Sequence, residues 1–169
     1  LDIQHRFALS GVASLPGRSR VFGGWKLGAI ASMQTGGALT AITQTNTTNV
    51  FSAGAQRANL LRNPNLPNSQ KSLTRWFDTS AFELPAPFTF GTAGRGILRA
   101  DGRINFDFSL NKDFRWRERL TTQLRLETFN AFNHADFGLP GTALAGSGFG
   151  VINAASDARV VQLGLRMAF

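Results

Sequence analysis

The side chains with the clearest potential for acid–base chemistry lie in segments where polar and apolar residues alternate. They are Asp107, Arg125, Glu127 and Arg166. Carboxylates with shifted pKa values serve as general acids and bases in many enzymes. On neighbouring β-strands, however, opposite charges stabilise a sheet by about 0.2–1 kcal/mol for each pair. The sequence shows no Ser-His-Asp arrangement and no nucleophile elbow, so we interpret all four residues as structural and predict that the chain is not an enzyme.

The sequence contains few residues that could bind a metal ion or a cofactor. His134 and Asp136 lie two residues apart, but two potential ligands without a third do not make a metal site. The glycine-rich run 146–150 is not followed by Lys-Ser or Lys-Thr, as a phosphate-binding loop would be. The sequence contains no Cys, which excludes disulfides, zinc fingers and thiol catalysis. We therefore predict neither a metal nor a cofactor.

The net charge first suggests nucleic acid as a partner. The 169 residues include 18 Lys and Arg against 10 Asp and Glu, a net charge of +8, and a basic chain of this kind can bind phosphates. The basic residues are scattered, however, and the densest group, 115–119, falls between two alternating segments, where a hairpin turn is expected. No nucleic-acid-binding motif accompanies it. We predict no nucleic-acid partner, and we interpret these side chains as turn residues that face water or lipid headgroups.

Apolar residues recur at every second position in several parts of the chain, which predicts β-strands. The clearest case is the C-terminal segment, where Val161, Leu163, Leu165, Met167 and Phe169 alternate with polar or small residues. Long helical stripes are missing and Gly is frequent. The pattern predicts an all-β fold of antiparallel up-and-down strands. We expect about five of them, at 3–13, 22–44, 103–114, 119–132 and 159–169.

The connections between these strands alternate in length. Short turns follow the first and third strands, whereas residues 45–102 and 133–158 form long loops. Short turns at one end and long loops at the other are typical of outer-membrane β-barrels, in which the long loops are extracellular. Alternation alone also suits a soluble sandwich, in which the apolar face points into a core shared by two sheets. The alternative hypothesis is therefore a soluble or surface-attached β-sandwich for carbohydrate binding or adhesion.

The last strand has the dimensions of a membrane-spanning strand. Its eleven residues, 159–169, extend about 37 Å. At a tilt of about 45° this length projects to about 26 Å, close to the apolar band of about 25 Å in membrane barrels. Phe169 ends the chain after this strand, and a terminal aromatic residue is the familiar signal for the barrel-assembly machinery. We predict that Phe169 serves as this signal.

Several motifs, taken in their order along the chain, resemble one known family. They are Asp2–Phe7, Gly23–Leu27 with Gln34–Gly36, Arg75–Phe82, Phe90–Arg95, and Glu127–His134 with Phe137. In this order they resemble the C-terminal end of TonB-dependent outer-membrane receptors. More narrowly they resemble the Oar-like transporters, which carry a carboxypeptidase-regulatory-like domain at their N-terminus. The chain departs from the family in a shorter turn at 16–18 and in Met167-Ala168, where bulkier residues are common.

The resemblance implies that residues 1–169 form about the last five of 22 strands of a transporter barrel in the outer membrane of a Gram-negative bacterium. It implies energised uptake of a substrate that the sequence does not identify. Lipid would surround the wall, and the TonB complex would act through a plug domain outside this sequence. The polar side chains expected to line the lumen are Asn105, Asp107, Gln123, Arg125, Glu127, Gln162 and Arg166.

Aromatic residues gather in the first long loop. Trp76, Phe77, Phe82, Phe88 and Phe90 could stack on a sugar or an aromatic ligand, and we treat them as candidates for ligand contact. The competing explanation is that they pack the loop onto itself.

Overall fold

The computed structural model describes residues 2–17, 19, 23–49, 54–116 and 120–169, and the chain divides into two compact units. The sheet unit comprises His5–Gln34, Arg103–Ala135 and Asp157–Phe169. The loop unit comprises Leu1–Gln4, Thr35–Gly102 and Asp136–Ser156. Each unit gathers segments that are far apart in the sequence, because the two long connections leave the sheet unit and return to it.

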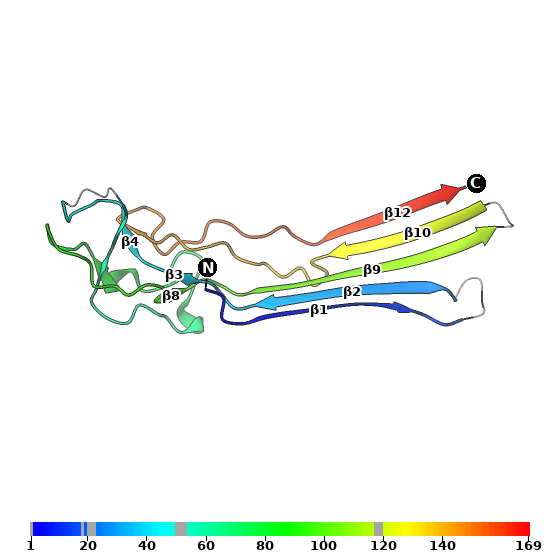
Figure 1. The fold of residues 1–169 in the computed structure, drawn as a ribbon, viewed down its shortest axis with the longest axis horizontal. Coiled ribbons are helices and arrows are strands. Elements are labelled where there is room, and N and C mark those ends of the chain that lie inside the picture. Colours follow the sequence, from blue (N-terminus) through cyan, green and yellow to red (C-terminus); the bar gives the residue numbers. More distant parts are fainter. Residues whose placement is uncertain (1, 18, 20–22, 50–53, 117–119) are drawn as a thin grey trace. The chain divides into compact units, whose positions relative to one another are not determined.

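Five long strands form the sheet unit (Figure 1). All neighbouring strands are antiparallel, and the spatial order follows the chain. This confirms the predicted all-β, up-and-down fold. The strands, in spatial order, are β1 (Arg6–Ser14), β2 (Trp25–Gln34), β9 (Arg103–Trp116), β10 (Leu120–Phe129) and β12 (Val160–Ala168).

Four of the five predicted strands match observed ones to within a few residues, whereas the strand predicted over 22–44 was wrong in its second half. Strand β2 ends at Gln34, and residues 35–44 belong to the loop unit. The reason lies at Gly36, where the backbone passes so close to the carbonyl group of Ala100 that a Cβ atom would collide with it. The predicted start at residue 22 lies outside the described residues. The first long connection therefore begins at Thr35 rather than at residue 45.

The register of the strands divides the sheet into an apolar face and a polar face. Directly paired residues share a face, so Leu163, Leu126, Leu110 and Leu27 form one apolar row across four strands. Gln162, Glu127, Ser109 and Gly28 form the neighbouring polar row. Each row of one kind is followed by a row of the other, as the period of a strand requires.

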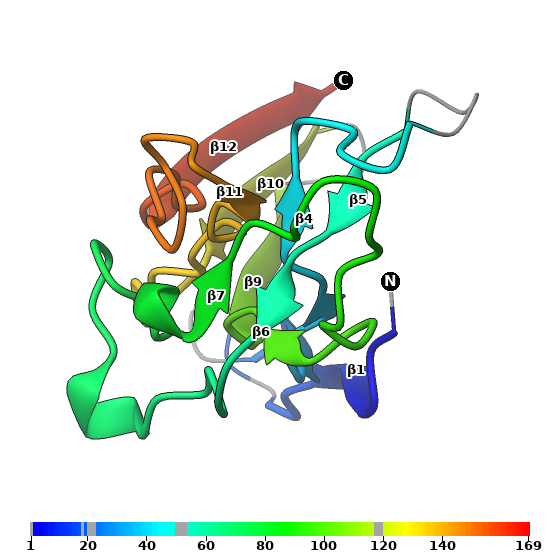
Figure 2. The same cartoon turned by 90° about the vertical axis from the view of Figure 1, so that its left-hand side faces the viewer.

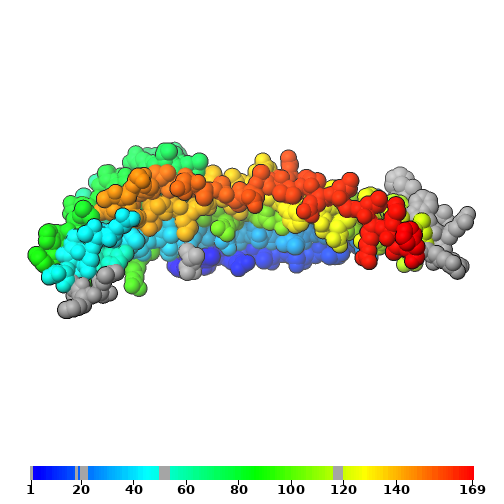
Figure 3. Space-filling model, turned by 90° about the horizontal axis from the view of Figure 1, so that it is seen from above, coloured from blue at the N-terminus to red at the C-terminus, as the bar shows by residue number. Residues whose placement is uncertain are grey.

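The apolar face of the sheet is open rather than buried. Leu163 is 76% exposed, and every residue of β1 and β12 is exposed. Figure 3 shows β12 in orange and red and β1 in blue along the surface of the sheet unit. All the buried apolar side chains among the described residues belong to the loop unit. A soluble sandwich would bury this face under a second sheet, and the described residues contain no such sheet.

No helix among the described residues is long and apolar enough to cross a membrane. The helical segments described are two short 3-10 turns, η1 (Asn68–Gln70) and η2 (Thr79–Ala81), both in the loop unit.

The loop unit is held together by short strands from both long connections. Figure 2 shows β4 (Ile42–Thr43) between β5 (Gln56–Arg57) and β11 (Ala143–Leu144). The pairing of β4 with β11 is parallel and joins the first connection to the second. Two further pairs are formed by β3 (Ala38–Leu39) with β8 (Leu98–Arg99), and by β6 (Asn59–Leu60) with β7 (Phe82–Glu83).

A charged substitution should have a different effect on the stability of the barrel on each face of the sheet. In the full-length parent protein, Leu163→Arg should place a charge on the apolar face and destabilise the folded state by up to about 2–4 kcal/mol. Gln162→Arg should be tolerated, because Gln162 lies on the polar face opposite Glu127. The fraction of folded protein in membranes, measured by its shifted electrophoretic migration without heating, checks this. Equal folded fractions for the two variants would contradict the assignment of the faces.

Candidate functional site

The seven side chains predicted to line a lumen all lie on the polar face of the sheet unit. Arg166 pairs with Gln123, which pairs with Asp113; Gln162 pairs with Glu127. Asn105 and Asp107 lie on the same face of β9, opposite Ser32 and Ile30. The structure thus brings the predicted set together on one wall.

Polar contacts on this face run from strand to strand. The Nε2 group of Gln123 donates to Oδ1 of Asp113 at 2.9 Å, and Nε of Arg125 donates to Oδ1 of Asn111 at 3.1 Å. Arg125 also lies 3.7 Å from the carboxylate of Glu127 along its own strand. Exposed ion pairs of this kind each contribute little to stability. These contacts link β9 to β10 on the polar face, where strand alternation has already placed the charged groups.

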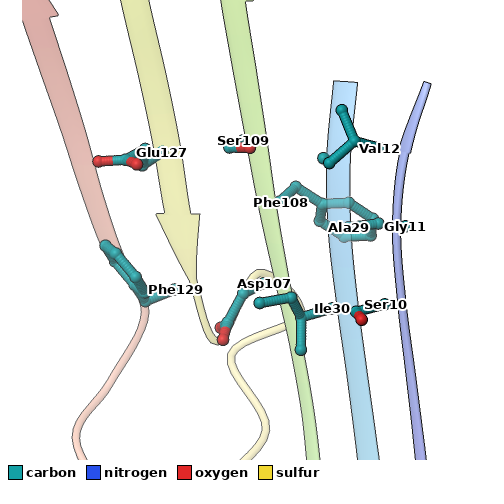
Figure 4. Close-up of a pocket in the computed structure, with 11 residues that line it drawn as sticks. Ser10, Gly11, Val12, Ala29, Ile30, Asp107, Phe108, Ser109, Glu127 and Phe129 are labelled. Atoms are coloured by element: carbon teal, nitrogen blue, oxygen red, sulfur yellow. The ribbon is translucent and has the colours of Figure 1, made fainter. Parts of the chain in front are cut away.

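The polar face is hollowed near its middle (Figure 4). The hollow has a volume of about 350 Å³ and includes side chains from β1, β2, β9 and β10. Glu127, Ser109 and Val12 lie at one level of it, and Asp107, Ile30 and Ser10 at the next. Gly28 supplies no side chain between Ser109 and Val12, and a Cβ atom there would meet Oγ of Ser109 at 2.5 Å.

The polar groups in the hollow are suited to hydrogen bonding and charge contacts. Oδ1 of Asp107 accepts a hydrogen bond from the backbone N–H of Asn130 at 2.9 Å, so part of this carboxylate already serves the turn that follows β10. The same turn holds His134, whose backbone N–H donates to Oδ1 of Asn130 at 2.9 Å. Among the described residues, no three His, Asp or Glu side chains come together as a metal ion would need.

Three of the five aromatic candidates in the first long connection are buried in the core of the loop unit. Phe77 is 2% exposed, and its ring meets those of Phe149 and Phe82 edge-on at 5.1 and 5.9 Å. Nε1 of Trp76 donates to the carbonyl of Arg99 at 2.9 Å. The prediction of ligand contact therefore needs correction for Trp76, Phe77 and Phe82. They pack the loop onto itself, because burial removes more apolar area from water there than a surface position would.

Phe88 and Phe90 remain on the surface of the loop unit, 74% and 68% exposed. Phe88 has a positive φ of 64°, which is rare for a bulky side chain. Its backbone N–H donates to the carbonyl of Thr47 at 2.6 Å. The backbone thus holds an aromatic ring in solvent at some conformational cost, and backbone strain of this kind clusters at functional positions.

A cluster around Asp78 stabilises the loop unit next to its aromatic core. Oδ2 of Asp78 accepts hydrogen bonds from Arg62 at 2.8 and 3.1 Å, and Oδ1 accepts one from the Ser80 hydroxyl at 2.7 Å. The hydrogen bond from Ser80 lowers the pKa of the Asp78 carboxyl, and the Arg62 guanidinium lowers this pKa as well, against an opposing effect of burial. Asp78 also caps η2 by accepting from the backbone N–H of Ser80.

The second long connection docks on the first through its backbone. The N–H of Trp76 donates to the carbonyl of Gly150 at 2.8 Å, and the N–H of Ile152 donates to the carbonyl of Leu73 at 2.7 Å. Gly150 has a φ of +79° and lies against Phe77 and Thr79, so a side chain at this position would clash. The two connections therefore fold as one unit.

A comparison with known protein families decides the class of the chain. A family model described as an outer membrane beta barrel domain matches residues 1–162 of the 169. The chain belongs to the outer-membrane β-barrel domain family. This places the protein in the outer membrane. No curated protein and no solved structure matches the chain significantly.

Sequence patterns missed two features of this barrel domain. The first is the Asp78 cluster, because nothing in the sequence indicates that Arg62, sixteen residues away, reaches Asp78. The second is Lys112, which lies on the apolar face of β9 beside Trp25. Even-numbered residues of β9 lie on the apolar face. Extending this alternation beyond Leu110 would have predicted that Lys112 lies on that face.

The charge of Asp78 makes the stability of the loop unit depend on pH. Because the pKa of Asp78 is lowered by folding, its stabilisation is present above the unfolded value and is lost as the pH falls through the folded-state pKa. Asp78→Asn should speed hydrogen exchange at the Ser80 amide at neutral pH and remove this acid dependence. Glu83→Gln, an exposed change in the same unit, serves as the control. Identical exchange in wild type and Asp78→Asn at neutral pH would contradict the role of the charge.

Proposed function

We propose that this barrel domain is part of a TonB-dependent transporter of the Oar-like type, which takes up a substrate with energy supplied from the inner membrane. The domain contributes barrel wall, a polar lumen lining and external loops. The proposal assigns no catalysis, no cofactor and no nucleic-acid partner to this chain. It rests on the family of the chain together with the motifs that resemble TonB-dependent receptors.

The observation that carries the proposal is that the two long connections fold into one unit with its own core. A channel for small solutes needs an open path, whereas a receptor needs surfaces that first hold a scarce substrate. Loops fixed on a rigid scaffold are the usual place for such surfaces. Phe88 and Phe90, exposed on the loop unit, are the aromatic side chains still suited to ligand contact.

The polar face of the sheet supports the same proposal. In a membrane barrel the apolar face meets lipid and the polar face lines the lumen. The seven predicted lumen residues share this polar face, and the hollow near Glu127 combines carboxylate and hydroxyl groups with the apolar side chains of Val12, Ile30 and Phe129.

The partners in this proposal are the TonB complex, reached through a plug domain outside this sequence, and the barrel-assembly machinery. Phe169 is 97% exposed and follows the last residue of β12.

Binding to TonB tests the proposal directly. The full-length parent protein, purified in detergent, should bind the purified periplasmic domain of TonB from the same bacterium in isothermal titration calorimetry. A porin from the same membrane is the control and should show no binding. Absence of saturable binding to the parent protein would overturn TonB-dependent transport while leaving the barrel fold intact.

The proposal also predicts on which side of the outer membrane each connection lies. If the final strand descends to the periplasm, antiparallel order places the long connections outside the cell and the short ones in the periplasm. Cys introduced at Ser69, exposed in η1, should react with a membrane-impermeant thiol reagent on intact cells, whereas Cys at Ser19 should not. The experiment requires a parent protein with no other accessible thiol. Labelling at Ser19 but not at Ser69 would invert the topology.

A further inference from the structure

The polar face of the sheet unit carries large apolar side chains in one area. Among the described strands, four such residues occupy polar-face positions, where all the other residues are polar or small: Val12, Ile30, Phe129 and Val160. The first three line the hollow, and Val160 pairs with Phe129. All four are 43–79% exposed. A break in an otherwise regular pattern is expected at functional sites, and apolar area on a face that meets water favours a covering ligand.

The hollow has the size and the mixed lining of a small-molecule site. Its volume of about 350 Å³ is within the usual range of about 300–1,000 Å³ for such sites. They are lined mainly by apolar side chains, and a few polar groups fix the orientation of the ligand. Figure 4 shows Asp107 between the apolar side chains of Ile30 and Phe129. Gly28, which has no side chain, leaves the space beside them open.

Two carboxylates give the hollow its charge. Asp107 of β9 and Glu127 of β10 lie in neighbouring rows as diagonal neighbours, a separation of about 7–8 Å. Oδ1 of Asp107 accepts the hydrogen bond from Asn130, and Oε1 of Glu127 lies 3.7 Å from Arg125. Within the described part of the chain, the second oxygen of each carboxylate makes no hydrogen bond or ion pair. These two oxygens are available to a ligand.

The charges around the hollow favour a cation over an anion. None of the described residues that line it is basic. The nearest basic side chains on this face, Arg125 and Lys26, lie in the next row. Each is within 3.7 Å of a carboxylate of its own, Glu127 and Asp113 respectively. A cation in the hollow would also be attracted to the aromatic ring of Phe129.

We propose that this hollow is a binding site in the lumen wall for a small organic cation, in which an ammonium or guanidinium group is joined to a short apolar body. The carboxylates of Asp107 and Glu127 bind the charged group, and the side chains of Val12, Ile30 and Phe129 cover the apolar body. The inference rests on the barrel family of the chain, in which the polar face lines the lumen. It requires neither TonB nor any energy source, so its failure and the failure of TonB binding are separate outcomes.

Three probes with the same apolar body test the preference for a cation. They are para-fluorophenethylammonium, para-fluorophenethyl alcohol and para-fluorophenylpropionate. Each is titrated into the full-length parent protein in a non-ionic detergent and followed by fluorine NMR. The ammonium probe should bind roughly tenfold more tightly than the propionate, with the alcohol in between. Equal dissociation constants for the three probes would overturn the proposal. So would the absence of saturable binding of the ammonium probe, which is the result expected if a plug domain fills the hollow.

Substitution of the carboxylates tests whether the cation binds in this hollow. The double variant Asp107→Asn with Glu127→Gln removes both charges and keeps the size of both side chains. It should weaken binding of the ammonium probe roughly tenfold and leave binding of the alcohol unchanged. Asp113→Asn is the matched control, because Asp113 lies on the same face outside the hollow. An equal loss in the control, or no loss in the double variant, would overturn the proposal.

A second variant keeps the test decisive should the double variant fail to fold. Ser109 lines the hollow, so Ser109→Leu should fill it and leave both carboxylates in place. Binding of the ammonium and alcohol probes should then weaken together. Unchanged binding of the ammonium probe to Ser109→Leu would overturn the proposal.

Discussion

The pairing of five antiparallel strands is the constraint on which the rest of this structure depends. Backbone N–H and C=O groups inside a bilayer have to be paired within the protein, because hydrocarbon offers them no partner. Continuous ladders between β1, β2, β9, β10 and β12 meet this demand for the interior strands. Successive side chains on a strand point to opposite faces. The same strand pairing therefore places Leu163 and Leu126 on one face and Gln162 and Glu127 on the other. The polar wall is thus a consequence of pairing and alternation together.

The loop unit follows a different physical rule from the sheet. Its residues bury an apolar core built around Phe77, Phe82 and Trp76, as a water-soluble domain does. The sheet unit, in contrast, leaves its apolar side chains exposed to the surroundings. One short chain therefore combines a sheet unit whose apolar face suits lipid with a loop unit stabilised by the hydrophobic effect in water.

The sequence was sufficient to predict the strands and their faces, because a period of two is a local signal. It placed the seven polar residues from Asn105 to Arg166 on one face, where the register has them. It was insufficient at residues 35–44, where the pattern continues but the close approach of Gly36 to Ala100 takes the chain out of the sheet. It also could not separate Phe77 from Phe88, since burial depends on docking of the second connection, which is remote in sequence. The position of Lys112 on the apolar face could have been predicted from the alternation of β9, but its contact with Trp25 could not, because Trp25 comes from another strand.

The central claim is that the two faces of the sheet meet different solvents, and a cysteine scan of β12 in the full-length parent protein tests it most directly. Each residue from Val160 to Ala168 is replaced in turn, and reaction with a water-soluble maleimide is compared with reaction with a lipid-soluble one. The account predicts a period of two, with Gln162, Gly164 and Arg166 positions favouring the water-soluble reagent and Val161, Leu163 and Leu165 positions the lipid-soluble one. Reactivity without alternation, or with the opposite phase, would contradict it.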